Sequence, residues 1–165
     1  MMKKKEIIIG IVGSTGAVGI ELINNLYSRY NNIQFNKLIL FSRSNKSIKT
    51  RFGVIQTQLF NLEKAKECSI IFLAVNSKFS KEYAKKLTGH SIVIDNSSAF
   101  RYDFEVPLII PEINGYLIKY NRLISNPNCT TAIALMVLFP IYVNYGIKKL
   151  LFQLIKQQVA QEKMV

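Results

Sequence analysis

The strongest constraint on the fold lies near the start of the chain, where an apolar run leads through glycines into a helical pattern. Glu6 to Val12 is a continuous, mostly β-branched run, which is typical of a strand buried on both faces of a parallel sheet. Gly13, Gly16 and Gly19 follow, and the segment Ala17 to Tyr30 then carries apolar residues at helical spacing. A strand, a glycine turn and a helix in this order predict the opening of a β-α-β unit.

The rest of the chain repeats this alternation of short apolar runs and helical segments. We expect a helix from about Phe79 to Leu87, and an edge strand or hairpin in Arg51 to Phe60. Four further strands are predicted at Lys37 to Phe41, Ser69 to Val75, Ser91 to Asp95 and Leu123 to Ser125. The expected fold class is α/β, a Rossmann-like doubly wound and mostly parallel sheet, followed by the start of an incomplete second domain.

The glycines are spaced G-x-x-G-x-x-G, a variant of the dinucleotide-binding fingerprint. In this setting glycines let the backbone approach a phosphate, and the start of the next helix supplies N–H donors for the anion. The sequence therefore predicts a dinucleotide site that includes Gly13 and Gly16. A glycine-rich turn without a ligand is the alternative.

The end of the second predicted strand bears on the choice of cofactor. NAD sites usually carry an acidic residue there, which binds the ribose hydroxyls. This chain has Ser42, Arg43 and Ser44 instead, and an arginine flanked by hydroxyls suits a 2′-phosphate. The prediction is NADP, and the alternative is that Arg43 is a solvated loop cation.

A cysteine, Cys129, follows a proline-bearing turn and precedes the apolar, helix-like run Ala132 to Phe139. At a helix N-terminus, unpaired N–H groups and the helix dipole favour the thiolate, which is the nucleophilic form. We therefore consider Cys129 a candidate nucleophile. The alternative is a small buried hydrophobic residue, which is the usual environment of a free cysteine.

Composition bounds the remaining possibilities. The net charge is +12, but lysines spread along the chain supply most of the 22 basic residues, so we expect no nucleic-acid partner. The 2 cysteines make no disulfide framework. The basic start is a poor signal peptide, and the apolar run Ala132 to Val143 contains Pro140 and is too short to span a bilayer. We expect a cytoplasmic protein without a membrane partner and without a metal site.

Four segments together resemble aspartate-semialdehyde dehydrogenase. They are Gly13-Ser14-Thr15-Gly16-Ala17-Val18-Gly19, then Asp95-Asn96-Ser97-Ser98-Ala99-Phe100-Arg101, Val106-Pro107-Leu108-Ile109-Ile110-Pro111-Glu112-Ile113-Asn114 and Asn126-Pro127-Asn128-Cys129-Thr130-Thr131. The Asn-Cys-Thr-Thr context is the most specific of them. N-acetyl-glutamyl-phosphate reductase shares the architecture, but the Gly-Cys-Tyr-Pro context of its cysteine is not found here.

The resemblance implies the NADP-dependent, phosphate-linked interconversion of aspartate semialdehyde and aspartyl phosphate, in the biosynthesis of lysine, threonine, methionine and diaminopimelate. It implies that Cys129 forms an acyl-thioester and that Arg101 binds phosphate. Thr15, Gly16, Ala17 and Val18 would bind the pyrophosphate, and Ser42, Arg43 and Ser44 the 2′-phosphate. Full-length members would be homodimers. The alternative for Arg101 is a structural cation that closes the loop beginning at Asp95.

The resemblance fails at the general base, which in the family is a histidine well beyond the cysteine. The single histidine, His90, precedes Cys129, and we expect it at the surface or at a strand edge. Members of the family are also longer. We expect an NADP-binding domain in residues 1–128 and the start of the catalytic and dimerisation domain in 129–150. The alternative function is an inactive, truncated NADP-binding fragment.

The last residues, 151–165, do not match the family. With suitable codons, a back-translation of 152–165 read in another frame gives S-T-Y-Q-A-A-S-G-A-G, which resembles the family's next segment. We therefore interpret 151–165 as an out-of-frame tail. Sequencing the gene across this region tests that hypothesis.

Overall fold

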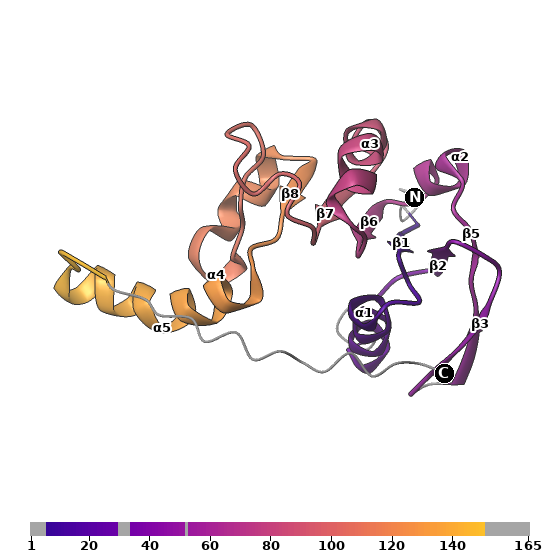
Figure 1. Cartoon of the computed structure of the whole chain (residues 1–165), viewed down its shortest axis with the longest axis horizontal. Helices are drawn as coiled ribbons and strands as arrows, with labels where there is room; N and C mark the ends of the chain where they lie inside the picture. Colours follow the sequence, from indigo (N-terminus) through magenta and orange to yellow (C-terminus); the bar gives the residue numbers. More distant parts are fainter. Residues whose placement is uncertain (1–5, 30–33, 52, 151–165) are drawn as a thin grey trace, which may run out of the picture.

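A six-stranded parallel sheet forms the centre of the molecule, with strand order β5-β2-β1-β6-β7-β8 (Figure 1). It is seen in a computed structural model that describes residues 6–29, 34–51 and 53–150. The strands are β1 (Ile8–Val12), β2 (Lys37–Ser42), β5 (Gln58–Leu59), β6 (Ile70–Leu73), β7 (Ile92–Asp95) and β8 (Leu123–Ser125). From β1 the chain first adds strands on one side, β2 and β5, and then adds β6, β7 and β8 on the other side. This reversal of strand order between β1 and β6 confirms the predicted doubly wound sheet.

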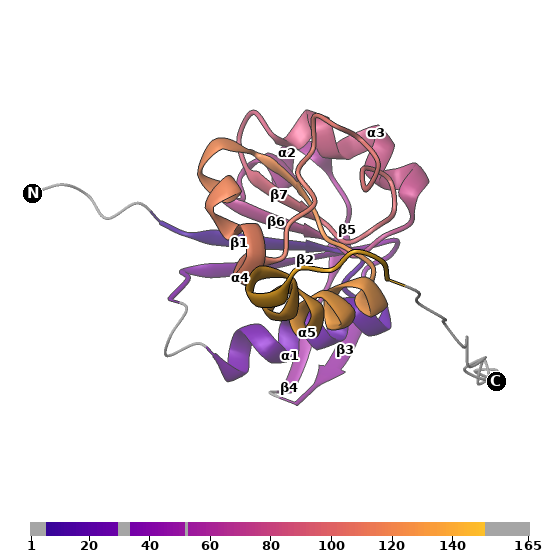
Figure 2. The same cartoon turned by 90° about the vertical axis from the view of Figure 1, so that its left-hand side faces the viewer.

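Helices cover both faces of this sheet. Helix α1 (Ala17–Ser28) lies on one face, while α2 (Leu62–Lys66) and α3 (Ser77–Leu87) lie on the other (Figures 1 and 2). Asparagines begin α2 and α3: the Asn61 side chain accepts a hydrogen bond from Lys64 N at 3.0 Å, and Asn76 accepts one from Phe79 N at 2.9 Å. These caps satisfy helix N–H groups that have no partner within the helix.

Each face has its own apolar core. On the α1 face, Ile23 and Leu26 of the helix pack with Ile9, Ile11 and Leu40 of the sheet. On the other face, Ala65, Ala84 and Leu87 of α2 and α3 pack with sheet residues, among them Val12, Phe41, Ile71, Leu73 and Val93. Alternate residues of these strands thus serve opposite faces, which is why the central residues of β1, β2 and β6 are predominantly apolar.

The segment predicted as an edge strand or hairpin forms part of a hairpin and also an edge strand. Strands β3 (Ser47–Thr50) and β4 (Gly53–Gln56) form an antiparallel hairpin, and β5 then pairs with the end of β2 as the sheet edge. The hairpin begins four residues before the predicted segment because Ser47–Thr50 is too polar to stand out by hydropathy.

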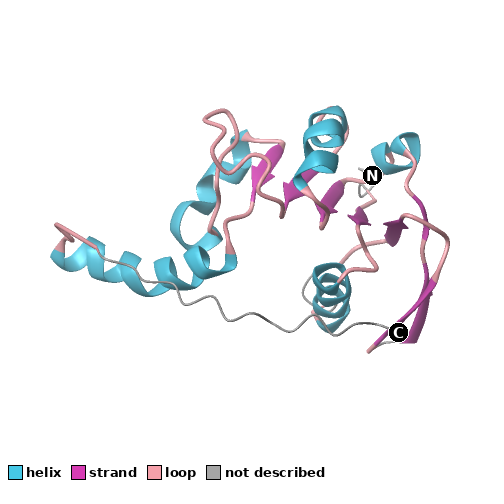
Figure 3. Ribbon diagram, in the orientation of Figure 1, coloured by secondary structure: helices cyan, strands magenta, loops and turns pink. Residues whose placement is uncertain are grey.

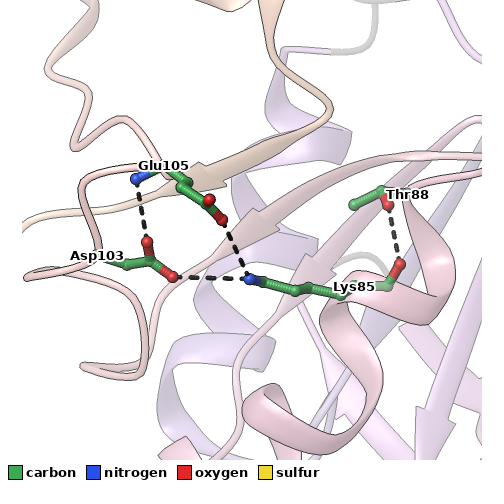
Figure 4. Close-up of polar contacts among 4 residues, drawn as sticks. All are labelled: Lys85, Thr88, Asp103 and Glu105. Carbon is green, nitrogen blue, oxygen red and sulfur yellow. Dashed lines mark hydrogen bonds and ion pairs between the residues drawn. The ribbon is translucent and has the colours of Figure 1, made fainter.

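After β7 the chain runs through a long loop, residues 96–110, before α4 (Pro111–Asn114) and the 3₁₀-helix η1 (Gly115–Tyr120) (Figure 3). Neither helix was predicted from the sequence. Ion pairs tie the loop to α3: Lys85 Nζ lies 3.8 Å from Asp103 Oδ2 and 3.7 Å from Glu105 Oε2 (Figure 4). Asp103 Oδ1 also accepts a hydrogen bond from Glu105 N at 3.0 Å. These contacts restrain the loop that carries Arg101.

The last described helix, α5 (Cys129–Tyr145), extends the predicted apolar run at both ends and projects from the sheet (Figure 1). It carries no charged residue and contains Pro140, and none of its residues is buried among the described part of the chain. A helix that is apolar all round is typical of one enclosed by a larger structure. No helix within the described residues is long and apolar enough to span a membrane. The proposed out-of-frame tail, 151–165, lies outside the described residues.

Candidate cofactor and thiol site

The turn after β1 requires glycine at its first position. Gly13 has φ +84°, and its N–H donates to Phe41 O at 3.0 Å. A Cβ atom at this position would lie 2.2 Å from Ala74 O. The backbone conformation and the lack of space both exclude a side chain at this position. The absence of a side chain lets the ends of β1, β2 and β6 lie close together around Gly13.

The other two glycines differ in their surroundings. A Cβ atom on Gly19 would lie 2.3 Å from Gly13 O, so this glycine allows α1 to pack directly on the turn. Gly16 is exposed, and the nearest atom to its Cβ would be Gly13 O at 3.5 Å. No side chain of the described residues caps α1 at Gly16, which leaves the first N–H groups of the helix free to bind an anion.

A cavity of about 660 Å³ opens beside this turn. It lies at the carboxyl ends of β1, β2 and β6, where the strand order reverses and dinucleotides bind in doubly wound folds. The cavity is lined by Val12, Gly13, Thr15, Gly16, Ser42, Arg43, Ser44, Lys46, Leu59, Phe60, Ala74, Val75, Asn76 and Phe79. Six of the eight predicted cofactor residues are therefore brought together. The other two, Ala17 and Val18, do not line the cavity and lie exposed in the first turn of α1.

The loop after β2 is fixed by a buried hydroxyl. Thr57 Oγ1 is 2.9 Å from Ser42 Oγ and accepts a hydrogen bond from Lys46 N at 3.1 Å, while Thr57 N donates to Lys46 O at 2.8 Å. Ser42 Oγ also donates to Ser44 O. The Ser42 hydroxyl is thus buried and already bonded within the protein, whereas Arg43 and Ser44 are exposed.

The candidate nucleophile is the first residue of α5. The Asn128 side chain caps this helix by accepting a hydrogen bond from Thr130 N at 2.9 Å. Cys129 is exposed, and its Sγ lies 3.9 Å from Asn128 Oδ1 and 3.9 Å from Thr130 Oγ1. The expectation of a thiol at a helix start is confirmed, and within the described residues the alternative of a buried cysteine is wrong for Cys129.

The buried cysteine is Cys68. It lies in the core beneath α2 and α3, and a Cβ atom on Gly10 would lie 2.8 Å from its Sγ. Burial, and to a smaller extent the charge of Glu67, raise the pKa of the Cys68 thiol to about 11. Cys68 is therefore a neutral core residue at physiological pH, and Cys129 is the accessible thiol.

Arg101 joins two loops. Its Nε donates to Asn126 O at 3.0 Å, and its Nη2 donates to Asn96 O at 3.1 Å. Arg101 thus makes the contacts expected of a cation that closes the loop beginning at Asp95. A guanidinium has five N–H donors, so these two bonds leave donors available to an anion.

Asp95, at the carboxyl end of β7, is fully buried. Its Oδ1 accepts from Ser80 Oγ at 2.7 Å and from Ser97 N at 3.1 Å, and its Oδ2 accepts from Ser97 Oγ at 2.8 Å. Two serines and a main-chain amide thus satisfy the buried carboxyl group. They tie α3 to the start of the loop that leads to Arg101.

His90 is exposed and precedes β7, at the amino-end edge of the sheet. Cys129 follows the carboxyl end of β8, which runs parallel to β7. His90 therefore lies at the amino ends of the strands and Cys129 at their carboxyl ends. This separation is expected for a histidine that does not serve as the base for this thiol.

Sequence reasoning missed three groups near the site. Lys46 lines the cavity beside Arg43, and its place in the same short loop was an available signal. Phe60 and Phe79 line the cavity and contact each other edge-on, with ring centroids 4.9 Å apart. Asn96 lies within a family-like motif, but its contact with Asn126 joins residues 30 apart in sequence and left no signal there.

The comparisons with known proteins define the class first. The family model described as "Semialdehyde dehydrogenase, NAD binding domain" matches residues 8–120, and the chain belongs to this family. The curated relatives are aspartate-semialdehyde dehydrogenases, which confirms the resemblance seen in the sequence motifs. That of Synechocystis sp. is 34% identical over 145 residues, covering 86% of this chain and 43% of the relative. That of Aquifex aeolicus is 37% identical over 149 residues, with coverage of 86% and 43%.

Solved structures agree. Aspartate semialdehyde dehydrogenase II of Vibrio cholerae, complexed with ASA, superposes with a TM-score of 0.72 at 29% identity, covering 87% of this chain and 48% of that one. A probable aspartate-semialdehyde dehydrogenase of Pseudomonas aeruginosa gives a TM-score of 0.73 at 20% identity, with coverage of 85% and 43%, and supports the fold alone. The chain thus spans less than half the length of the relatives it matches.

Proposed function

We propose that this chain is the NADP-binding and thiol-bearing part of an aspartate-semialdehyde dehydrogenase. The reaction oxidises aspartate semialdehyde with NADP and phosphate to aspartyl phosphate, and in cells runs in the reductive direction. A single observation carries the proposal. The carboxyl ends of the parallel strands bring the cavity, the Arg101 loop and the exposed Cys129 to one edge of the sheet.

The cavity suits a dinucleotide. Gly16 offers open space beside the free N–H groups of α1, where a pyrophosphate would be held by Thr15, Gly16, Ala17 and Val18. Gly13, which also lines the cavity, supports this site by its close packing against Ala74. When bound, the nicotinamide accepts or donates a hydride, which no side chain can do.

NADP is favoured over NAD by the charges around the cavity. Among the described residues, its lining includes Arg43 and Lys46 and no carboxylate. NAD sites place an acidic residue at the end of the second strand, where this chain has Ser42. We assign the 2′-phosphate to Arg43, Ser44 and Lys46, with Ser42 acting through its bond to Thr57 rather than directly.

Cys129 is the proposed nucleophile. Its Sγ adds to the aldehyde carbon, and the resulting adduct is oxidised to a thioester that phosphate cleaves. The thiol is exposed at the first residue of α5, where a substrate can reach it. Arg101, half-buried beside the same loop, would orient the phosphate with its remaining N–H donors.

Two regions follow from this assignment: a cofactor-binding region in residues 1–128, and the start of a catalytic and dimerisation domain in 129–150. A second candidate function is a cofactor-binding module without turnover. Two observations favour it for a polypeptide of these 165 residues: His90 lies beyond the opposite sheet edge from Cys129, and α5 is uncovered among the described residues. Loss of a general base costs about 100-fold or more.

Protection of the thiol by substrate tests the proposal. Aspartate semialdehyde is expected to slow alkylation of Cys129 by iodoacetamide, because Sγ is then bonded to the aldehyde carbon and cannot react with the reagent. Propionaldehyde at the same concentration is the control and should protect less. Equal labelling with and without aspartate semialdehyde would contradict the proposal. Phosphate-dependent NADPH formation by the wild-type chain, lost in Cys129→Ser, would decide for the enzyme over the module without turnover.

A further inference from the structure

The residue three positions before Cys129 is held more firmly than its exposure requires. Asn126 is exposed, yet its N donates to Asp95 O at 2.8 Å, its Nδ2 donates to Asn96 Oδ1 at 2.6 Å, and its O accepts from Arg101 Nε at 3.0 Å. The side-chain bond to Asn96 lies in an exposed position, where water can replace either partner at little cost. This bond therefore serves to fix the loop rather than to satisfy a buried polar atom.

The partner of the Asn126 amide is itself anchored to the centre of the sheet. Asn96 N donates to Leu73 O, the last residue of β6, at 3.0 Å. Asn96 O accepts from Arg101 Nη2 at 3.1 Å, and its side-chain oxygen accepts from Asn126. Asn96 thus links β6, the Arg101 guanidinium and the cysteine loop through three different atoms.

The same linkage orients the proposed phosphate-binding group. The two carbonyl groups that accept from Arg101 belong to Asn96 and Asn126, and the side-chain bond between these asparagines sets the distance between the carbonyls. Loss of that bond would allow the loop before Cys129 to move relative to Arg101. The start of α5, which carries the Cys129 thiol, would move with it.

We propose that Asn96 is a positioning residue for the thiol: through its bond to the Asn126 amide it holds the start of α5 in the orientation that activates Cys129. The chemical meaning of this role rests on the proposed function. The linkage itself acts on the free protein, before any cofactor or substrate binds.

The test measures thiol reactivity in the complete chain without cofactor. Asn96→Ala is expected to lower the alkylation rate of Cys129 by iodoacetamide at pH 8 by about 2- to 10-fold, the effect of losing one hydrogen bond. Peptide-resolved mass spectrometry follows Cys129 and Cys68 together, and Cys68 should remain unlabelled while the fold is intact.

Asn126→Ala provides a second route to the same result, since it removes the donor and leaves the contacts of Asn96 with Leu73 and Arg101 unaltered. If the bond carries the effect, each single variant gives the same decrease in the alkylation rate and the double variant adds nothing further. Neither side chain is buried, so neither truncation leaves a core cavity.

Asn121→Ala is the matched control, because the Nδ2 of this asparagine likewise donates one hydrogen bond, of 2.8 Å to Leu117 O, and the residue precedes β8, at the amino ends of the strands. It should leave the alkylation rate unchanged. Wild-type alkylation rates in both Asn96→Ala and Asn126→Ala, or additive effects in the double variant, would overturn the inference. Because NADP is not used, failure of cofactor binding would refute the proposed function and leave this result standing.

Discussion

Gly13 lies against the main chain of Ala74 so closely that a Cβ atom would approach the carbonyl oxygen to 2.2 Å. Its φ of +84° adds a second restriction that L side chains rarely accept. The tightest packing in the glycine-rich turn is therefore between Gly13 and the main chain of Ala74, within the protein itself. Gly16, by contrast, has open space, with Gly13 O the nearest atom to its Cβ at 3.5 Å.

This difference predicts opposite outcomes for two alanine substitutions. Gly13→Ala should lower the free energy of unfolding by about 2 kcal/mol or more, through strain and a backbone clash. Gly16→Ala should change it by less than about 1 kcal/mol but weaken NADP binding, because the methyl group enters the space beside the helix start. Urea denaturation and NADP titration measure the two effects. Equal unfolding free energies for the two variants would contradict this assignment.

The cations of the cavity should act on the 2′-phosphate and not on the rest of the cofactor. Lys46→Ala is expected to weaken binding of 2′,5′-ADP about 3- to 10-fold, as for one charge-assisted hydrogen bond, and to leave 5′-AMP unaffected. Lys49→Ala is the control, since Lys49 lies in the adjoining strand β3 but does not line the cavity. Equal effects of the two substitutions on 2′,5′-ADP would show that only overall charge matters.

Cys68 predicts a pH dependence of stability. Its pKa is about 11 in the folded protein against 9.0 as the ordinary value, so between these pH values the folded chain keeps a proton that the unfolded chain releases. The unfolded state then binds fewer protons, and stability should fall as the pH rises from about 9 to about 11. In Cys68→Ala this part of the slope should disappear, as measured by urea denaturation at each pH. An unchanged slope would refute the contribution of this thiol.

The uncovered surface of α5 should promote association of the chain. Ile133 and Val137 lie one helical turn apart and are 70% and 64% exposed. Their joint replacement by lysine should reduce concentration-dependent association, measured by sedimentation velocity, without a large change in melting temperature. Val54→Lys is the control, because Val54 is 66% exposed but lies on β4. Association that persists in the α5 variant would exclude this helix as its cause.

The sequence located the strands well where local pattern decides. Leu123 to Ser125 was predicted with the bounds of β8, and Ser91 to Asp95 missed β7 by one residue. Patterns of this kind follow from burial on both faces. Helices α2 and α4 and the 3₁₀-helix η1 were missed because they are short and lack an apolar period. Their form depends on tertiary contacts.

The candidate site divides in the same way. Cys129 at a helix start and the glycine turn were predictable, since each is a local motif. The roles of Ser42 and Arg101 depend on distant partners: Thr57, Asn96 and Asn126 satisfy groups that the sequence alone left free for a ligand. Residues brought together across 15 to 30 positions leave no local signal.

The most direct test of the account is calorimetric titration of NADP and NAD into the 165-residue chain, repeated with Arg43→Ala. We predict that NADP binds at least about tenfold more tightly than NAD, and that Arg43→Ala removes most of this difference while leaving NAD binding unchanged. Equal affinities for the two cofactors in the wild-type chain, or no binding of either, would contradict the central claim that the cavity beside Gly16 is an NADP site.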